Sequence, residues 1–134
     1  YVLVHDGARP LADRELFGRV IAEMHKSWGS CDGIIPGVPV KDTIKEGEHG
    51  LVKRTLKRDS LWAVQTPQIF KFEAISRAYE KAMEKKRYAT DDAALLERYG
   101  GRIRIIMGSY RNIKITTPED LIIAEALLRA HSKP

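Results

Sequence analysis

Short apolar runs that alternate with amphipathic stretches constrain the fold of this chain more than any other feature. Residues 1–4, 31–36 and 103–107 are apolar enough to form buried strands. Between and after these runs, apolar residues recur every three or four positions, which is the period of one helix face. Strands that alternate with helices of about 10 to 16 residues predict a layered α/β domain with a mainly parallel sheet.

Capping residues mark where several of the expected helices begin and end. Asp13 closes the loop before the first helix, Thr90 is a good N-cap, and Thr117 precedes Pro118 at the last helix start. We expect helices over residues 14–28, 72–86, 91–99 and 118–130, and a further strand over 113–116. The apolar face of the second helix should consist of Phe72, Ile75, Tyr79, Ala82 and Met83.

Residues 38–60 are expected to form a charged β-arm that leaves the body of the domain. Two β-compatible segments, 41–45 and 51–56, flank a hairpin loop at 47–50. The stretch from Lys41 to Arg58 holds six basic and three acidic residues, which favours anionic partners. Because an isolated hairpin is marginally stable in water, we expect the arm to pack on another subunit.

Composition fits one domain and excludes several classes of protein. The chain has 134 residues, of which 43% are hydrophobic, enough to build a core. No apolar run is long enough to span a bilayer. Cys31 is the only cysteine, which excludes an intrachain disulfide and a cysteine metal cluster and fits a cytoplasmic protein.

The chain opens directly on an apolar run, with no polar leader before Tyr1. Since an exposed terminus is usually polar and frayed, we expect residues 1–134 to be the C-terminal part of one larger domain.

Candidate site residues follow the expected strand ends, where ligands gather in α/β sheets. Asp6 could hold a divalent metal, and Arg9 could clamp a phosphate. Other residues able to orient an anion are Asp42, Thr43, Arg58, Thr66 and Lys114. Taken one by one, all are more simply explained as caps, turns or solvated charges. The helix dipole similarly explains Asp91 and Asp92.

Five segments in order give these residues a more specific meaning. They are HDGARP (5–10), VKDTIK (40–45), RDSLWAVQTPQIF (58–70), TDDA (90–93) and NIKITTPEDL (112–121). Together they resemble the 2-C-methyl-D-erythritol 4-phosphate cytidylyltransferases, and the resemblance covers nearly the whole chain. It implies a Rossmann-like nucleotidyltransferase fold, layered α/β/α, with a protruding arm.

The resemblance also implies an activity and a set of site residues. Family members transfer CMP from CTP to methylerythritol phosphate, release pyrophosphate, and require magnesium. By resemblance, Asp6 would hold the Mg²⁺ ion, and Arg9, Thr66 and Lys114 would line the sugar-phosphate site. Lys114 would also steady charge at the α-phosphate. Thr43 and Arg58, on the arm, would reach across a homodimer to the substrate phosphate.

One part of the family pattern does not occur in this chain. The sequence has no zinc-ligand spacing, no Ser/His/Asp arrangement and no glycine-rich phosphate loop. In the family, the glycine-rich loop that grips CTP precedes the matched segments. We therefore expect residues 1–134 alone to be inactive.

Three other functions fit parts of the sequence. A pentitol-phosphate cytidylyltransferase, acting for example on ribitol 5-phosphate, shares much of the motif set. A basic nucleic-acid-binding module is disfavoured, because the arm between Lys41 and Arg58 has no aromatic residue for base stacking. A dimerisation unit without catalytic activity is the third possibility.

Overall fold

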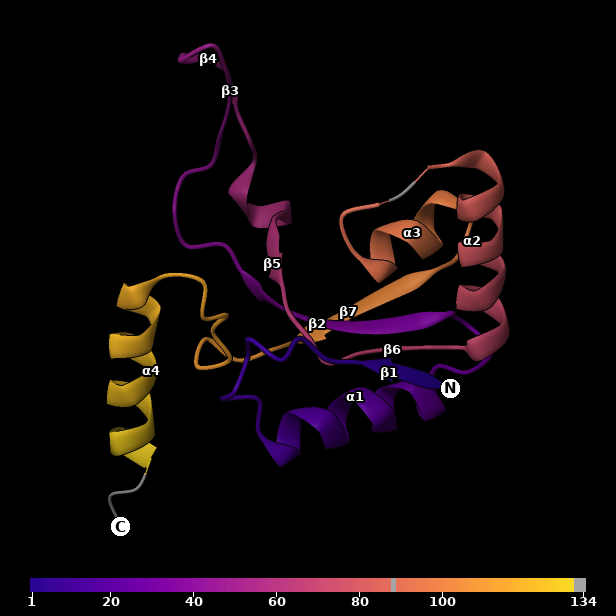
Figure 1. The fold of residues 1–134 in the computed structure, drawn as a ribbon, viewed down its shortest axis with the longest axis horizontal. Coiled ribbons are helices and arrows are strands. Elements are labelled where there is room, and N and C mark those ends of the chain that lie inside the picture. The colour runs from indigo at the N-terminus through magenta and orange to yellow at the C-terminus, as the bar shows by residue number, and fades with distance from the viewer. Residues whose placement is uncertain (88, 132–134) are drawn as a thin grey trace.

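The computed structural model describes residues 1–87 and 89–131, which form a sheet covered by helices on both faces and a projecting hairpin (Figure 1). The strands are β1 (Val2–Val4), β2 (Gly33–Pro39), β3 (Lys45–Glu48), β4 (Leu51–Thr55), β5 (Trp62–Val64), β6 (Gln68–Phe70) and β7 (Ile103–Met107). The helices are α1 (Arg14–Lys26), α2 (Phe72–Lys85), α3 (Asp92–Arg98) and α4 (Pro118–His131), with a 3₁₀ turn η1 (Arg58–Ser60).

The main sheet is built around β2. Hydrogen bonds link its strands in the order β1-β6-β2-β5. β6 pairs with the first residues of β2 and β5 with its last residues, and β7 pairs with the opposite edge of β2. Only β7 pairs with β2 in parallel, whereas the β1–β6, β2–β6 and β2–β5 pairs are antiparallel. The prediction of a mainly parallel sheet is therefore wrong for the described residues. After the arm, the chain returns along β2 as β5 and β6, and an antiparallel return needs no crossover helix.

Alternate residues of the central strands supply two separate cores, one on each face of the sheet. Ile34 and Ile69 pack with α1, whose buried residues are Leu16, Val20 and Met24. The next residues along each strand, Ile35 and Phe70, pack on the opposite face with α2 and α3. This alternation is the two-residue period of a strand, and it confirms the layered α/β/α architecture.

The observed helix ends agree only in part with the ends predicted from the sequence. Asp13 caps α1 by accepting a hydrogen bond from the backbone N–H of Leu16. For α3, the cap is Asp91 rather than Thr90, since the Asp91 carboxylate accepts from the N–H of Ala94. In α2, the expected apolar face is only partly right. Its buried residues are Ile75, Ala78 and Ala82, whereas Phe72, Tyr79 and Met83 are exposed.

The arm projects from the end of β2 as a two-stranded hairpin (Figure 1). β3 and β4 pair only with each other, and the turn consists of His49 and Gly50, both with positive φ. The first strand of the hairpin is Lys45–Glu48, so the strand expected over 41–45 is wrong except for Lys45, and the turn is shorter than the expected 47–50 loop. At the tip, Leu51 and Val52 are 75% and 63% exposed, so the hairpin has apolar side chains that the described part of the chain does not cover.

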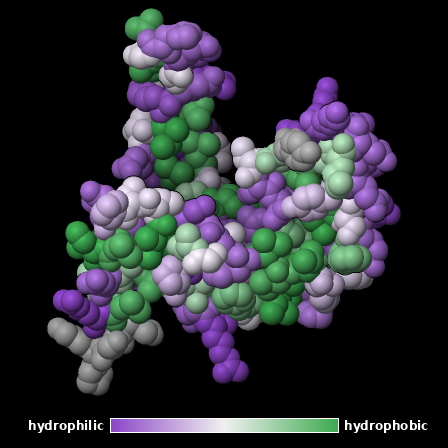
Figure 2. All heavy atoms as spheres, viewed as in Figure 1, coloured by the Kyte–Doolittle hydropathy of each residue, from purple (hydrophilic) through white to green (hydrophobic). Residues whose placement is uncertain are grey.

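Helix α4 extends from the body of the domain (Figure 1). Figure 2 shows hydrophobic residues gathered on it, and Leu121, Ile122, Ile123 and Leu128 are all exposed. Its first turn is fixed by Asp120, whose carboxylate accepts from the N–H groups of Thr116 and Thr117. Nowhere in residues 1–87 and 89–131 does a helix have both the length and the apolar character needed to cross a bilayer.

Asp32, directly before β2, connects this strand to the segments that contain Lys71 and Arg102. Its carboxylate accepts from the backbone N–H of Arg102 at 3.0 Å and forms an ion pair with Lys71 at 3.2 Å. The hydrogen bond from Arg102, followed by the contact with Lys71, holds the pKa of Asp32 below its ordinary value, against the opposing effect of burial. The charged form of Asp32 is therefore the form that stabilises the fold.

Replacing Asp32 with Asn should lower the free energy of unfolding at pH 7 by about 1–2 kcal/mol. Because the folded-state pKa is depressed, the carboxylate contributes fully above its unfolded pKa of about 3.9. This contribution is lost as the pH falls through the folded-state value. Urea unfolding between pH 7 and pH 3 should show the gap between wild type and Asp32→Asn closing below about pH 4. Asp59→Asn, on the exposed η1 turn, is the control, and a gap that stays constant with pH would contradict this role.

Candidate active site

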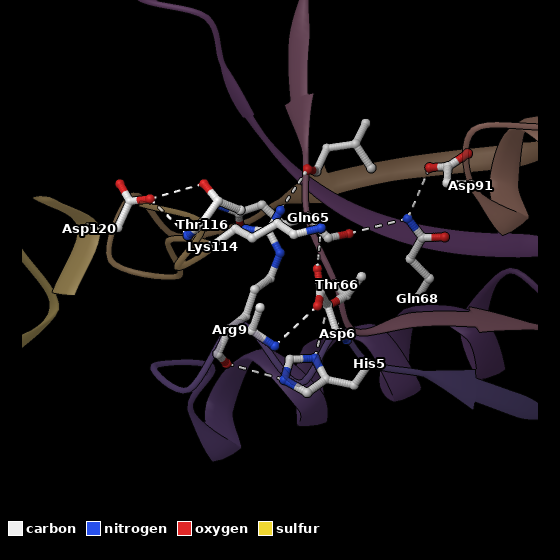
Figure 3. A network of polar contacts seen from close by, with 12 residues as sticks. His5, Asp6, Arg9, Gln65, Thr66, Gln68, Asp91, Lys114, Thr116 and Asp120 are labelled. Atoms are coloured by element: carbon white, nitrogen blue, oxygen red, sulfur yellow. Dashed lines mark hydrogen bonds and ion pairs between the residues drawn. The ribbon is translucent and has the colours of Figure 1, made fainter. Parts of the chain in front are cut away.

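Three segments distant in the sequence meet beyond the carboxyl end of β1. They are the turn at residues 5–9, the break between β5 and β6 at 65–67, and the segment at 108–115 that follows β7 (Figure 3). Direct hydrogen bonds connect them, including one from the N–H of Ile115 to the carbonyl of Ala8 at 2.8 Å. The structure thus brings together Asp6, Arg9, Thr66 and Lys114, four of the six residues to which the family resemblance assigns a role.

Asp6 is an ionised carboxylate held by two donors. Its Oδ2 lies 2.8 Å from the Lys114 ammonium, and its Oδ1 accepts from the N–H of Ala8 at 3.1 Å. The hydrogen bond from Lys114 is the largest cause that keeps the pKa of Asp6 below its ordinary value, and the Ala8 contact adds to it. At neutral pH, Asp6 is consequently available as a hard anionic oxygen donor.

Thr66 is fixed between His5 and Asp6. Its Oγ1 accepts from the backbone N–H of Asp6 at 3.0 Å and lies 2.9 Å from Nδ1 of His5. The other ring nitrogen of His5 is 3.3 Å from the carbonyl of Arg9, which can only accept. In the neutral ring, Nε2 therefore carries the proton, and the Thr66 hydroxyl donates to Nδ1.

Arg9 binds backbone carbonyls rather than a carboxylate. Its terminal nitrogens donate to the carbonyls of Asn112 at 2.7 Å and Val64 at 3.4 Å. Burial lowers the pKa of this guanidinium from its ordinary value, although Asp6 opposes the shift. A second hydrogen on each terminal nitrogen remains for an anion. Arg9 thus both joins the three segments and adds positive charge beside Asp6.

Lys114 lies on an irregular segment. The strand predicted over 113–116 does not form. Its side chain is 49% exposed, and one ammonium hydrogen is directed to Asp6. The other two can meet a ligand. An exposed ammonium anchored at one point is suited to neutralising phosphate oxygens that bind next to it.

Thr43 and Arg58 lie on the arm, apart from this cluster. Arg58 donates to the carbonyl of Lys41 at 2.9 Å, and both residues are exposed. Within the described residues, no hydrogen bond or ion pair joins either of them to the four clustered residues. A single copy of the chain therefore does not assemble all six residues into one site.

Two buried amides, Gln65 and Asn112, belong to the cluster but were missed in the sequence. They are 6% and 1% exposed. Gln65 donates to the carbonyl of Ser109, and Asn112 donates to the carbonyl of Thr66. Both residues stand inside the matched segments, Gln65 directly before Thr66 and Asn112 two positions before Lys114, and this neighbourhood was the signal that could have identified them. A buried amide has no periodicity of its own, so the hydropathy pattern could not find them.

The donor set fits a magnesium ion that is shared with a ligand. In the described part of the chain, no three His, Cys, Asp or Glu side chains gather closely enough to hold a metal by themselves. Mg²⁺ is commonly bound through one or two carboxylates, with substrate phosphates and waters completing its shell. Asp6 provides one such carboxylate, next to cations that would attract the phosphates.

A cationic site with one carboxylate, at the strand ends of an α/β/α sandwich, has the organisation of a Rossmann-like nucleotidyltransferase. The model of the IspD family, 2-C-methyl-D-erythritol 4-phosphate cytidylyltransferase, matches residues 1–130, and the chain belongs to this family.

Individual relatives agree with this assignment. The chain is 44% identical over 128 residues to the 2-C-methyl-D-erythritol 4-phosphate cytidylyltransferase of Geobacter metallireducens, covering 96% of this chain and 53% of the relative. It is 51% identical over 129 residues to that of Alkaliphilus oremlandii, covering 96% and 53%. The chain thus spans about half the length of the curated relatives it matches.

Solved structures of the family share the fold. The enzyme from Thermus thermophilus superposes with a TM-score of 0.84 at 37% identity, over 96% of this chain and 61% of that one. The Francisella tularensis enzyme gives a TM-score of 0.86 at 30% identity, over 94% and 58%.

Proposed function

We propose that this chain is part of an enzyme that transfers CMP from CTP to 2-C-methyl-D-erythritol 4-phosphate and releases pyrophosphate. The observation that carries the proposal is the ion pair of Asp6 and Lys114 beside Thr66 and Arg9, in a chain that belongs to this family. On this view, residues 1–134 are the C-terminal part of one cytidylyltransferase domain. The lone buried Cys31 and the bacterial relatives support a cytoplasmic location.

The reaction asks the protein mainly for positioning and positive charge. A phosphate oxygen of methylerythritol phosphate attacks the α-phosphorus of CTP, and the bond to the bridging oxygen of pyrophosphate breaks. Negative charge grows on the α-phosphate oxygens and on the leaving group. The Lys114 ammonium would stabilise the α-phosphate, and Arg9 and Thr66 would orient the sugar phosphate. The attacking phosphate is already an anion, so the step requires no dedicated base.

Asp6 is the residue we propose to hold magnesium. When bound, the ion would neutralise phosphate charge and align the phosphate groups of the nucleotide. Asp6 Oδ2 contacts the Lys114 ammonium, whose two other hydrogens would be available to the α-phosphate.

The arm supports a homodimer. Leu51 and Val52 are exposed at its tip, and within residues 1–87 and 89–131 no hydrogen bond or ion pair joins Thr43 or Arg58 to the cluster of their own chain. We propose that the arm packs on a second copy, so that Thr43 and Arg58 serve the phosphate site of that partner. The excess of cations on the arm suits such a role.

Substrate competition tests the proposed reaction. The full-length protein should form a cytidylyl product from CTP and methylerythritol phosphate with a kcat/KM at least about tenfold above that for ribitol 5-phosphate. Pyrophosphate release and the mass of the product are the measurements, and omission of Mg²⁺ is a control. Preference for ribitol 5-phosphate would replace this substrate with the pentitol alternative, and turnover of neither phosphate would exclude the proposed activity.

A further inference from the structure

Two buried amide side chains connect the segment of Lys114 to the break between β5 and β6. Gln65 and Asn112 both contact residues that belong to the other segment, and neither side chain is expected to touch a bound phosphate, because both are buried. Gln65 lies next to Thr66 (Figure 3), and Asn112 is two residues before Lys114, so these hydrogen bonds constrain the backbone from which Thr66 and Lys114 extend.

The side-chain amide of Gln65 hydrogen-bonds both the carbonyl and the N–H of Ser109, as the backbone of a neighbouring strand would. Its Nε2 donates to the carbonyl of Ser109 at 2.8 Å, and its Oε1 accepts from the N–H of the same residue at 3.2 Å. The approach is so close that a Cβ at position 108 would lie 2.4 Å from this Oε1 and 3.1 Å from the carbonyl of Gly37. A side chain at position 108 would therefore push the Gln65 amide away from its present position.

Asn112 continues the connection toward the site. Its Nδ2 donates to the carbonyl of Thr66 at 2.8 Å and lies 3.4 Å from Oε1 of Gln65. Its own carbonyl accepts from Arg9 at 2.7 Å. Two residues further on, Lys114 reaches Asp6. A shift of Asn112 would therefore move the backbone from which Lys114 extends.

We propose that Asn112 is a positioning residue, which acts on the reaction through Lys114. Its amide fixes the distance between the Thr66 backbone and the segment of Lys114, so the ammonium sits over the phosphate site rather than free in solvent. Gln65 holds the start of the same segment. This inference rests on the proposed function, since it concerns the placement of Lys114 for phosphate transfer.

A double-mutant cycle in the full-length enzyme tests the proposal. Misplacing a charge by about an ångström can cost on the order of a hundredfold in rate. We expect Asn112→Ala to lower kcat/KM for the phosphorylated sugar alcohol by roughly 10- to 100-fold when Lys114 is present. In the Lys114→Ala background, the same substitution should cost less than about threefold. An equal cost in both backgrounds would overturn the proposal.

Two further variants separate positioning from stability. Asn112→Asp keeps the shape of the side chain but removes the donor to Thr66, and it should show the same dependence on Lys114 if Asn112→Ala fails to fold. Ser27→Ala removes a polar group of similar burial at the far end of α1 and should leave kcat/KM unchanged. Melting temperatures of both Asn112 variants should fall equally in the two backgrounds. Absence of wild-type turnover would refute the proposed function, whereas wild-type turnover without coupling would refute this inference alone.

Discussion

Replacing Lys114 with Ala in the full-length enzyme should lower kcat/KM by roughly 10²- to 10³-fold, the usual loss when one preorganised donor to a developing oxyanion is removed. Lys114 is half exposed and belongs to neither core, so the fold should persist. Pyrophosphate release under single-turnover conditions is the measurement. Lys26→Ala, an exposed lysine at the end of α1, is the matched control.

The same substitution should also raise the pKa of Asp6, which can be measured without an activity assay. The Lys114 hydrogen bond is the largest cause of the lowered pKa of Asp6, so this pKa should rise toward its ordinary value of about 3.9 in Lys114→Ala. NMR titration of the carboxyl group would detect the change. A variant with full activity and an unchanged Asp6 titration would show that the ion pair has no role in the site.

Mixing two inactive variants should restore activity if the site is shared between protomers. Lys114→Ala disables the body of one copy, and Arg58→Ala disables the arm of the other. In a randomly exchanged dimer population, about half of the dimers are mixed, and each carries one site with both residues intact. We therefore expect about a quarter of the wild-type rate from a mixture whose components are each nearly inactive.

The complementation experiment has a matched control and a clear negative outcome. A mixture of Lys114→Ala with the double variant Lys114→Ala/Arg58→Ala contains no intact site and should stay inactive. If Arg58 acts within its own chain, mixing restores nothing, because each mixed dimer then holds two defective sites. Sedimentation velocity of the wild type tests for the dimer independently.

The sequence predicted those parts of the fold that depend on local patterns. The loop that ends at Asp13 and the apolar strand of the second run were predicted from local patterns, and the structure confirms both. Strand direction was not predictable in this way, because pairing depends on how the chain returns from the arm. Phe72 and Met83 have helical spacing with Ile75, yet they lie outside the face that the sheet covers.

The charged candidate residues could be singled out because they stand in motifs, whereas their surroundings could not be predicted. Asp6 and Lys114 are 108 positions apart in the numbering but 2.8 Å apart in space. No periodicity encodes that distance. The contacts of Gln65 and Asn112 with backbone carbonyls likewise depend on the path of the folded chain, which composition and spacing do not determine.

The way the arm joins the sheet has a mechanical consequence. β2 is hydrogen-bonded along both edges and is almost wholly buried, which makes it one of the least deformable segments of the chain. The arm leaves from its last residue and returns through β5, which is bonded to the same strand. The base of the arm is therefore held to the sheet on both of its connections to the body, up to Pro39 and from Trp62 onward. A partner that binds Leu51 and Val52 would be attached to the domain through this base.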